Sequence, residues 1–449
     1  MLTQKRPNLL FVICHDLGRH LPFYGHATVR TPNLARLAEE GVLFDNYFCT
    51  APQCSPSRGS IFTGRYPHAN GLWGLVNGGW DLPDEERHLA AVLRDAGYRS
   101  VLVGHQHEHH EPERLGYREV HKEAGARARN VGPAAAEWLR TEAERQPFFL
   151  SIGMAEPHRS YEAEGYEPDD PDSVWVPPYL PDTRETRSMV GRLHGLVKAL
   201  DEGVGAILDG LARSAAADNT IVVFTTDHGL AMPRAKCTLY DPGVETALIL
   251  RRPGETMAGK TRSELLSNVD LLPTLLDLLD VAKPENLQGR SFAPLLTGHP
   301  YRSRKAIYVE KSFHGPCHPM RGVRTATHKY IRNWRTDLPM EIPLDIQWGF
   351  DVATLRKHYA EPLPSEELYD LGRDPDEMKN LADDPAHAKL RAELRDMLER
   401  EFASTGDALL KDVPPPDPRA LHLTEDEYWA WSREGAEVLK QEEFRARNR

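Results

Sequence analysis

Short apolar runs alternate with longer amphipathic segments along the first half of the chain. The apolar runs have the length of buried strands, and they cover residues 9–13, 42–44, 100–103, 148–152 and 220–225. The intervening segments carry helical periodicity or helix-end signals, and they cover residues 33–40, 88–96, 133–143 and 188–211. This alternation predicts an α/β fold, in which a parallel sheet is covered by helices on both faces.

The pattern changes near residues 298–304, where a Gly-His-Pro-Tyr-Arg-Ser-Arg segment interrupts it. Beyond this segment, residues 306–309 and 329–332 have the character of strands in a small antiparallel sheet. Residues 386–402 then predict a long amphipathic helix. A second, smaller domain therefore follows the α/β domain in this interpretation.

The predicted organisation has three parts. A large domain covers residues 1–300, a small α+β domain covers residues 301–410, and a C-terminal extension covers residues 411–449. The extension carries Trp429 and Trp431 among many charged residues, and we expect it to form a docking arm or a homo-oligomer contact.

The charge of the chain narrows the range of partners. Its 449 residues include 67 acidic and 55 basic side chains, which gives a formal net charge of -12. This balance argues against a nucleic-acid-binding protein. An anionic substrate would need cations that are gathered locally.

The cysteines and the apolar runs indicate the cellular compartment in which the protein is located. Five cysteines, an odd number spread along the chain, do not make a disulfide framework, so a reducing compartment fits best. The first eight residues lack the apolar core of a signal peptide, and no run approaches the roughly 20 apolar residues of a membrane span. We expect a cytoplasmic protein that does not contact a membrane.

Polar residues follow four of the predicted strands. In chain order they are His15 and Asp16, His105 and His107, His158, and Asp227 and His228. Ligands of open α/β sheets bind at the carboxyl ends of the strands. The recurrence of histidine and aspartate at these ends predicts a functional site at that edge of the sheet.

A more specific signal is the segment Cys-Ser-Pro-Ser-Arg at residues 54–58, which resembles the C-x-P-S-R signature of type I sulfatases. The resemblance covers most of the chain, with further matching blocks at residues 7–18, 31–42, 227–229, 236–240 and 268–274. Within the family, residues 70–75, 319–324 and 367–381 look most like the heparan N-sulfatase branch. The resemblance implies a large mixed, mostly parallel sheet flanked by helices, as in alkaline phosphatase, with a smaller C-terminal α+β domain.

The resemblance also implies a mechanism and a substrate class. Cys54 would be oxidised to formylglycine by a separate maturation enzyme, and the aldehyde would hydrate to a gem-diol. One diol oxygen would attack sulfur, and the second hydroxyl would then expel sulfate without attack by water on sulfur. The implied enzyme is a sulfuric ester hydrolase, a sulfatase, that acts on a sulfate ester or an N-sulfate of a carbohydrate.

Further family roles fall on named residues of this chain. Arg58 would hold the formylglycine and metal region together, and His107 would remove a proton from the diol. His158 and Lys236 would bind sulfate oxygens and protonate the leaving group. One divalent metal would polarise the sulfate, with candidate ligands Asp16, Cys54, Asp227, His228 and His15.

Two positions depart from the family pattern. His15 stands where the family has the first residue of an Asp-Asp pair, and His105 replaces a lysine. The resemblance implies calcium, but the imidazoles of His15 and His228 suit manganese or zinc better, so the metal stays open. His105 could bind sulfate through a positive charge only when protonated, and we therefore expect activity to fall as pH rises through its titration.

The substrate loop is less specific than the metal site. His314, Arg321 and Arg324 lie in a segment that resembles the N-sulfatase substrate loop, and arginine can grip a carboxylate or sulfate with its bidentate fork. We predict that these three residues bind substrate. Ordinary salt bridges of the small domain would account equally well for any one of them.

Two other functions remain open at this stage. Phosphonate monoester and phosphodiester hydrolases of the same superfamily share formylglycine and an Asp-His metal pair, and relative rates on matched aryl esters would separate them from a sulfatase. A non-catalytic carbohydrate-binding protein with a decayed metal site is favoured only by His15 and His105.

Overall fold

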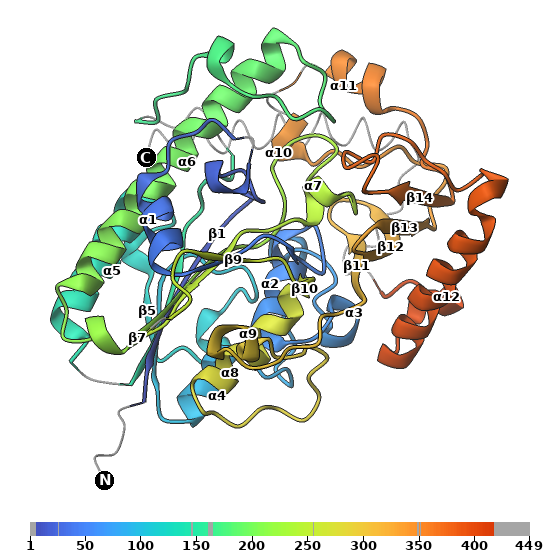
Figure 1. The fold of residues 1–449 in the computed structure, drawn as a ribbon. Coiled ribbons are helices and arrows are strands. Elements are labelled where there is room, and N and C mark those ends of the chain that lie inside the picture. Colours follow the sequence, from blue (N-terminus) through green and yellow to red (C-terminus); the bar gives the residue numbers. More distant parts are fainter. Residues whose placement is uncertain are drawn as a thin grey trace.

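A computed structural model describes residues 6–25, 27–144, 147–159, 165–254, 256–347, 350 and 352–416. A large sheet is covered by helices, and a smaller sheet lies beside it with a long helix on its outer side (Figure 1). The C-terminal extension beyond residue 416, with Trp429 and Trp431, lies outside the described residues. The predicted domain boundaries stay predictions.

The large sheet has eight strands and contains all five strands predicted from the apolar runs. Their order is β5 (Glu119–His121), β4 (Arg99–Gly104), β6 (Phe148–Gly153), β1 (Asn8–Cys14), β7 (Thr220–Thr226), β8 (Leu248–Arg251), β2 (Val42–Phe44) and β9 (Lys260–Arg262). Among these strands β8 alone is antiparallel to its neighbours, β7 and β2. The prediction of a mixed, mostly parallel sheet is confirmed.

The central strand β1 is buried on both faces, which accounts for its unbroken apolar sequence. Leu10 and Val12 pack into the core shared with helices α1 (Pro32–Glu40), α5 (Ala128–Glu142) and α6 (Arg184–Ala212). Leu9, Phe11 and Ile13 pack into the opposite core, shared with α2 (Cys54–Thr63), α4 (Leu89–Asp95) and α8 (Leu271–Leu278). The sheet is thus held between two helical layers.

Helix α5 begins earlier than the sequence predicts. The predicted start was residue 133, because proline favours a first helical turn, but the helix begins at Ala128 and Pro133 lies inside it. Gly132 packs closely against helix α6, since a Cβ there would lie 2.8 Å from the Cα of Gly203. This packing stabilises the helix through a position where proline removes a backbone donor.

The smaller sheet is antiparallel, as predicted, and has two strands more than the two expected. Its order is β11 (Ala306–Phe313), β12 (Cys317–Thr325), β13 (His328–Asn333) and β14 (Glu366–Asp370). The predicted amphipathic helix is α12 (Ala388–Thr405), whose Leu394, Leu398 and Phe402 pack on this sheet.

Shorter elements complete the described fold. They are β3 (Tyr47–Phe48), β10 (Leu266–Ser267), α3 (Pro67–Asn70), α7 (Asp241–Val244), α9 (Ala293–Thr297), α10 (Leu344–Gln347) and α11 (Val352–Tyr359). Across the residues that the structure describes, no helix combines the length and the apolar character that crossing a membrane requires.

A buried histidine makes the stability of this fold sensitive to acid. His88 caps α4, its Nδ1 accepts a bond of 3.0 Å from the N–H of Ala90, and burial lowers its pKa to about 3. Below pH 6.5 the unfolded chain binds a proton that folded His88 does not, so stability falls as pH falls. At pH 5 this histidine should cost about 2 kcal/mol. We expect His88→Asn, which keeps a capping group, to flatten the pH dependence of the unfolding free energy by that amount in urea titrations.

The matched control is His299→Asn at an exposed histidine. It should leave the pH dependence as in the parent protein. An unchanged slope in His88→Asn would contradict the assignment.

Candidate active site

The polar residues at the strand ends lie close together, as strand order predicts. The ring of His15, after β1, lies with its centroid 4.9 Å from that of His105 and 6.1 Å from that of His107, which both follow β4. It lies 5.6 Å from the ring of His158, which follows β6. Asp227, after β7, joins them through a 3.0 Å contact between its Oδ2 and His15 Nδ1.

Asp227 is the most highly connected carboxylate of the site. Its Oδ1 accepts bonds from the backbone N–H groups of Asp16 (3.0 Å) and His228 (2.8 Å), and its Oδ2 accepts one from Arg58 Nε (3.1 Å). Burial opposes ionisation, but the charges of His228 and Arg58, together with the hydrogen bond from His15, outweigh it and hold the pKa of Asp227 well below its usual range. Asp227 is therefore a buried carboxylate that stays charged.

A glycine lets the chain fold at this point. A Cβ on Gly229 would lie 2.0 Å from the carbonyl oxygen of Pro242. The Asp-His-Gly sequence thus has a local reason for its third residue: only glycine allows the loop after β7 to pass this backbone.

Asp16 lies opposite Asp227 and contacts two cationic groups. Its Oδ2 accepts a 2.9 Å bond from Lys236 Nζ, and its Oδ1 lies 3.0 Å from His228 Nε2. Burial disfavours its charge, but Lys236, His158 and His228 outweigh burial and keep the pKa of Asp16 well below its usual range. The backbone of Asp16 has φ 53°, a left-handed conformation that aspartate tolerates better than most residues.

Cys54 is the first residue of α2 and its side chain lies within this group. Its Sγ is 3.3 Å from His228 Nε2 and 4.0 Å from Asp16 Oδ1. Burial raises the pKa of the thiol, although Lys236 and His228 oppose the shift. The unmodified side chain is therefore a neutral thiol and not a primed thiolate nucleophile.

Helix α2 is buried along its whole length. Hydrogen bonds fix it to the ends of β1 and β7, the strands that Asp16 and Asp227 follow. The Ser57 hydroxyl donates to the Asp227 carbonyl oxygen, and Asn268 Nδ2 donates to Ser57 Oγ at 2.9 Å. Arg58 extends from the same turn, and its Nη2 donates to the carbonyl of Cys14 at 3.2 Å. The Ser-Arg half of the motif thus holds position 54 against β1 and β7.

The surroundings of His105 bear on the predicted pH dependence, because they lower the pKa of its ring. Burial, together with the neighbouring His15, lowers the pKa of His105 well below its usual range, and burial and His15 do the same for His107. Burial and Arg58 lower the pKa of His15 to about 4. At neutral pH these rings are neutral, so any fall of activity through the titration of His105 is expected at a pH below the usual range of histidine.

Asp345 belongs to the site and was missed by the sequence analysis. It lies in the short helix α10, its Oδ2 accepts a 2.8 Å bond from Lys236 Nζ, and the same oxygen is 3.7 Å from His158 Nε2. Burial opposes its ionisation, but Lys236 and His158 outweigh burial and lower the pKa of Asp345 to about 2. No motif surrounds this residue, and it follows none of the large sheet's strands, so sequence offered no local signal.

The structure contradicts the predicted substrate contacts of Arg321 and Arg324. Arg321 is fully buried, its Nε bonds Asp407 at 2.5 Å, and its guanidinium lies between the rings of Trp73 and Phe402. Arg324 Nη2 bonds Asp241 of α7 at 2.9 Å. Both arginines are saturated by buried partners and hold the small sheet in place.

The predicted substrate residue His314 lies in a second cluster. Its Nδ1 is 3.2 Å from Glu341 Oε1, and the two residues group with Cys237. A substrate role for His314 stays a prediction.

The donor set at the first cluster fits a divalent cation. Ligand atoms of His15, Asp16, Cys54 and Asp227 all lie within 4.8 Å of one another, and all four residues are buried. His228 adds a fifth donor, because its Nδ1 faces the carbonyl of Gly229 at 3.1 Å and its Nε2 faces Asp16 and Cys54. A histidine whose second nitrogen bonds a backbone carbonyl is oriented as metal-binding histidines are.

A family model named Sulfatase matches residues 7–281, more than half of the chain. The chain belongs to the sulfatase family. A second model, N-sulphoglucosamine sulphohydrolase, C-terminal, matches residues 228–347 of this sulfatase. Membership implies in general terms a metal ion and a formylglycine.

Individual relatives agree with the family. N-sulphoglucosamine sulphohydrolase of Homo sapiens is 28% identical, over 94% of this chain and 96% of the relative. A structure described as bound to its substrate D-glucosamine-2-N,6-O-disulfate is 22% identical with a TM-score of 0.70, over 90% of this chain and 99% of the other. A phosphonate monoester hydrolase from Silicibacter pomeroyi is 23% identical with the same TM-score of 0.70, over 90% of this chain and 97% of the other. The last two likenesses establish the shared fold.

Proposed function

We propose that this sulfatase removes sulfate from a sulfated amino sugar, with formylglycine at position 54 and one divalent cation. The observation that carries the proposal is the packing of Lys236, His158 and Asp345 beside the Asp16–Cys54–Asp227 cluster. The names of the human relative and of the second family model support an amino sugar as substrate.

The cation would be held by Asp16, Asp227 and His228, with His15 and position 54 as further donors. A bound divalent cation would polarise the sulfate and favour ionisation of the formylglycine hydrate. Calcium is the metal that family resemblance suggests. We propose manganese or zinc instead, because His15 and His228 bring imidazole nitrogens to a site with only two carboxylates.

The other residues have separate tasks in this proposal. Lys236 is a buried cation, since the charges of Asp16 and Asp345 outweigh burial and raise its pKa well above the usual range, and it would hold sulfate oxygens. His158 Nδ1 lies 2.8 Å from the Arg159 carbonyl, to which it donates its proton, so Nε2 would exchange a proton with the leaving group. His107, neutral at neutral pH, would accept a proton from the formylglycine hydrate. Arg58 would hold the side chain at position 54 and the Asp227 carboxylate in fixed relative positions.

Asp345 favours an N-sulfate over an O-sulfate. The bridging nitrogen of an N-sulfate carries an N–H that can donate to the Asp345 carboxylate, whereas the bridging oxygen of a sulfate ester has no hydrogen to donate. A carboxylate near a sulfate would otherwise repel it. After cleavage the product amine can take up a proton, and the same carboxylate would stabilise the ammonium.

The discriminating experiment is Asp345→Asn in the matured enzyme. We expect kcat/KM for N-sulfated glucosamine to fall roughly 10- to 100-fold more than kcat/KM for glucosamine 6-O-sulfate, the worth of one hydrogen bond to a charged group. Ion chromatography of released sulfate provides both rates. Asp337→Asn, at an exposed aspartate paired with Arg335, is the matched control and should change neither rate.

Equal losses of kcat/KM on the two substrates would mean that Asp345 only positions Lys236 and does not distinguish an N-sulfate from an O-sulfate. If no sulfated saccharide releases sulfate from protein carrying formylglycine, the proposed function itself is wrong. Faster cleavage of an aryl phosphonate than of the matched aryl sulfate would favour the phosphonate hydrolase alternative.

Three further points stay proposals. A formylglycine-generating maturation enzyme would act on the segment around Cys54. The five cysteines are buried and none of them is in a disulfide, which supports a reducing, cytoplasmic location. A homo-oligomer through the C-terminal extension would be tested by light scattering of the full chain and of a chain ending at residue 416.

A further inference from the structure

A concave site lies between helix α12 and the segment that leads into β11. Its volume is about 620 Å³, within the range of about 300–1,000 Å³ that small-ligand sites occupy. Its lining comes from the loop between α8 and α9, the segment before β11, β11 itself and α12, and includes none of the active-site residues: Arg290, Arg302, Ser303, Arg304, Lys305, Ala306, Tyr308, Met397, Arg400 and Glu401.

The lining is strongly basic on a protein whose net charge is -12. Five of its ten residues are arginine or lysine, and Glu401 is its one carboxylate. Asp270 neutralises Arg304 through a bidentate ion pair. Within the described part of the chain no ion pair is recorded for Arg302, Lys305 or Arg400, and each of these three is exposed.

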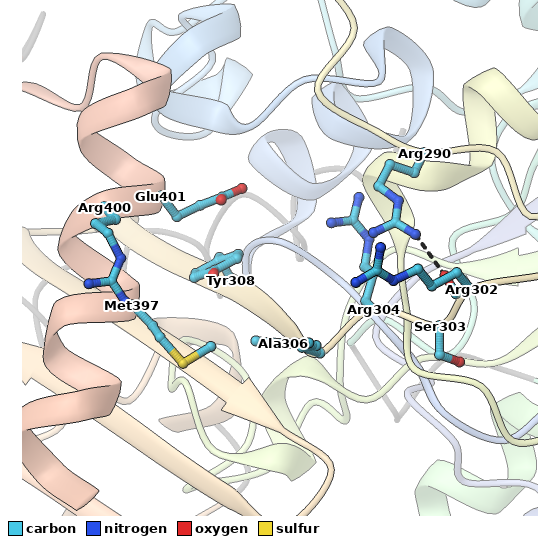
Figure 2. Close-up of a pocket in the computed structure, with 10 residues that line it drawn as sticks. Arg290, Arg302, Ser303, Arg304, Ala306, Tyr308, Met397, Arg400 and Glu401 are labelled. Atoms are coloured by element: carbon cyan, nitrogen blue, oxygen red, sulfur yellow. Dashed lines mark hydrogen bonds between the residues drawn. The ribbon is translucent and has the colours of Figure 1, made fainter. Parts of the chain in front are cut away.

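The arginines on one wall are gathered together. Figure 2 shows the side chains of Arg290, Arg302 and Arg304 close to one another, with Arg400 across the cavity on α12. Arg290 Nη2 donates to the Arg302 carbonyl at 2.7 Å, which fixes its guanidinium in this group. Asp270 balances only one of these charges, so the cluster keeps a positive charge that would attract an anion.

The floor of the cavity suits a sugar ring. Tyr308 is half-buried between the arginine cluster and the α12 wall, which carries Arg400 and Glu401 (Figure 2), and Met397 of α12 lies beside it. An aromatic ring with guanidinium groups on both sides can pack against the apolar face of a pyranose while the cations bind its sulfate or carboxylate groups.

We propose that this cavity, which we call the α12 groove, binds a sulfated saccharide chain at a site separate from the catalytic centre. The proposal rests on the proposed function, because the same anionic saccharide class would reach both sites. A chain held in the α12 groove raises the local concentration of its sulfated end, so the groove lowers KM for long substrates and leaves monosaccharides unaffected.

The test is a charge reversal in the full chain, Arg302→Glu with Arg400→Glu, which touches no active-site residue. Binding of a fluorescent sulfated octasaccharide is measured by anisotropy at 0.15 M salt, in a Cys54→Ala background that prevents turnover. We expect affinity to fall at least about tenfold, as repulsion replaces attraction at two positions. With Cys54 intact and matured, kcat/KM for a sulfated monosaccharide should be unchanged.

The matched control reverses two exposed arginines elsewhere, Arg118→Glu with Arg213→Glu, and should bind the octasaccharide as the parent does. The neutral pair Arg302→Gln with Arg400→Gln, with an unchanged melting temperature, should give an intermediate loss and guards against misfolding of the reversed variant.

Two results would overturn the inference: unchanged octasaccharide binding in the reversed variant, or equally tight groove-dependent binding of a single-stranded DNA octamer, which would make the groove a general polyanion site. Loss of binding in the reversed variant, in a protein that releases sulfate from no saccharide, would keep the groove and refute the proposed function.

Discussion

Replacing Cys54 by serine should abolish multiple turnover, with a loss of at least about 10⁴-fold in kcat. Serine fits the space, because Cys54 is buried at the start of α2, but a serine sulfate has no second hydroxyl that could expel sulfate. One equivalent of product could form and remain bound. Rapid-quench measurement of sulfate and free sugar separates a single turnover from none.

The same chemistry has a mass signature. After coexpression with a formylglycine-generating enzyme, the peptide with residue 54 should weigh about 18 Da less than the cysteine form, since a thiol has become an aldehyde. Cys317→Ser, at another buried cysteine, should keep both this mass change and the activity. Steady turnover by Cys54→Ser would refute the release argument.

Asp227→Asn should give the second large effect, because it removes a charge on which both metal binding and the stability of the fold depend. The variant keeps the shape of the side chain but lowers the negative charge offered to a cation, and it removes the nearer of the two carboxylates that pair with buried Arg58. We expect loss of bound metal, loss of activity by about 10³-fold or more, and an unfolding free energy lower by roughly 3 kcal/mol. Metal analysis by mass spectrometry and urea titration measure the first and the last effect.

A matched buried aspartate separates metal loss from simple destabilisation. Asp201 is 2% exposed and caps α1 by accepting bonds from the N–H groups of Asn33 (3.1 Å) and Leu34 (2.8 Å). Asp201→Asn should lower stability while metal content and kcat stay as in the parent. Full metal content in Asp227→Asn would exclude Asp227 as a ligand, and the metal found in the parent decides between calcium and manganese or zinc.

Some features followed from the sequence alone. The five apolar runs lie in five strands of the large sheet, because a strand buried on both faces must be apolar throughout. The His and Asp residues after four of these strands lie together, because the carboxyl ends of parallel strands meet at one edge. The Cys-Ser-Pro-Ser-Arg segment indicated the family, which the family model then confirmed.

Other features depended on contacts between distant segments. Helix α5 begins before Pro133 because its packing on α6 outweighs the preference of proline for the first helical turn. His105 is neutral because burial removes the water that would stabilise its charge. Arg321 and Arg324 carry positive charges, which is why the sequence predicted that they bind an anionic substrate. Asp407 and Asp241 neutralise these charges inside the fold.

The sequence by itself thus determined the family, the large sheet and the residues at its edge, because strand periodicity and short motifs are local properties of the chain. Only the tertiary structure decided the environment of those residues. Asp345 reaches Lys236 from 109 positions away, and the α12 groove joins two segments separated by almost a hundred residues. Burial and charge pairing are properties of the folded molecule, so protonation states and sites of this kind cannot be inferred from local sequence.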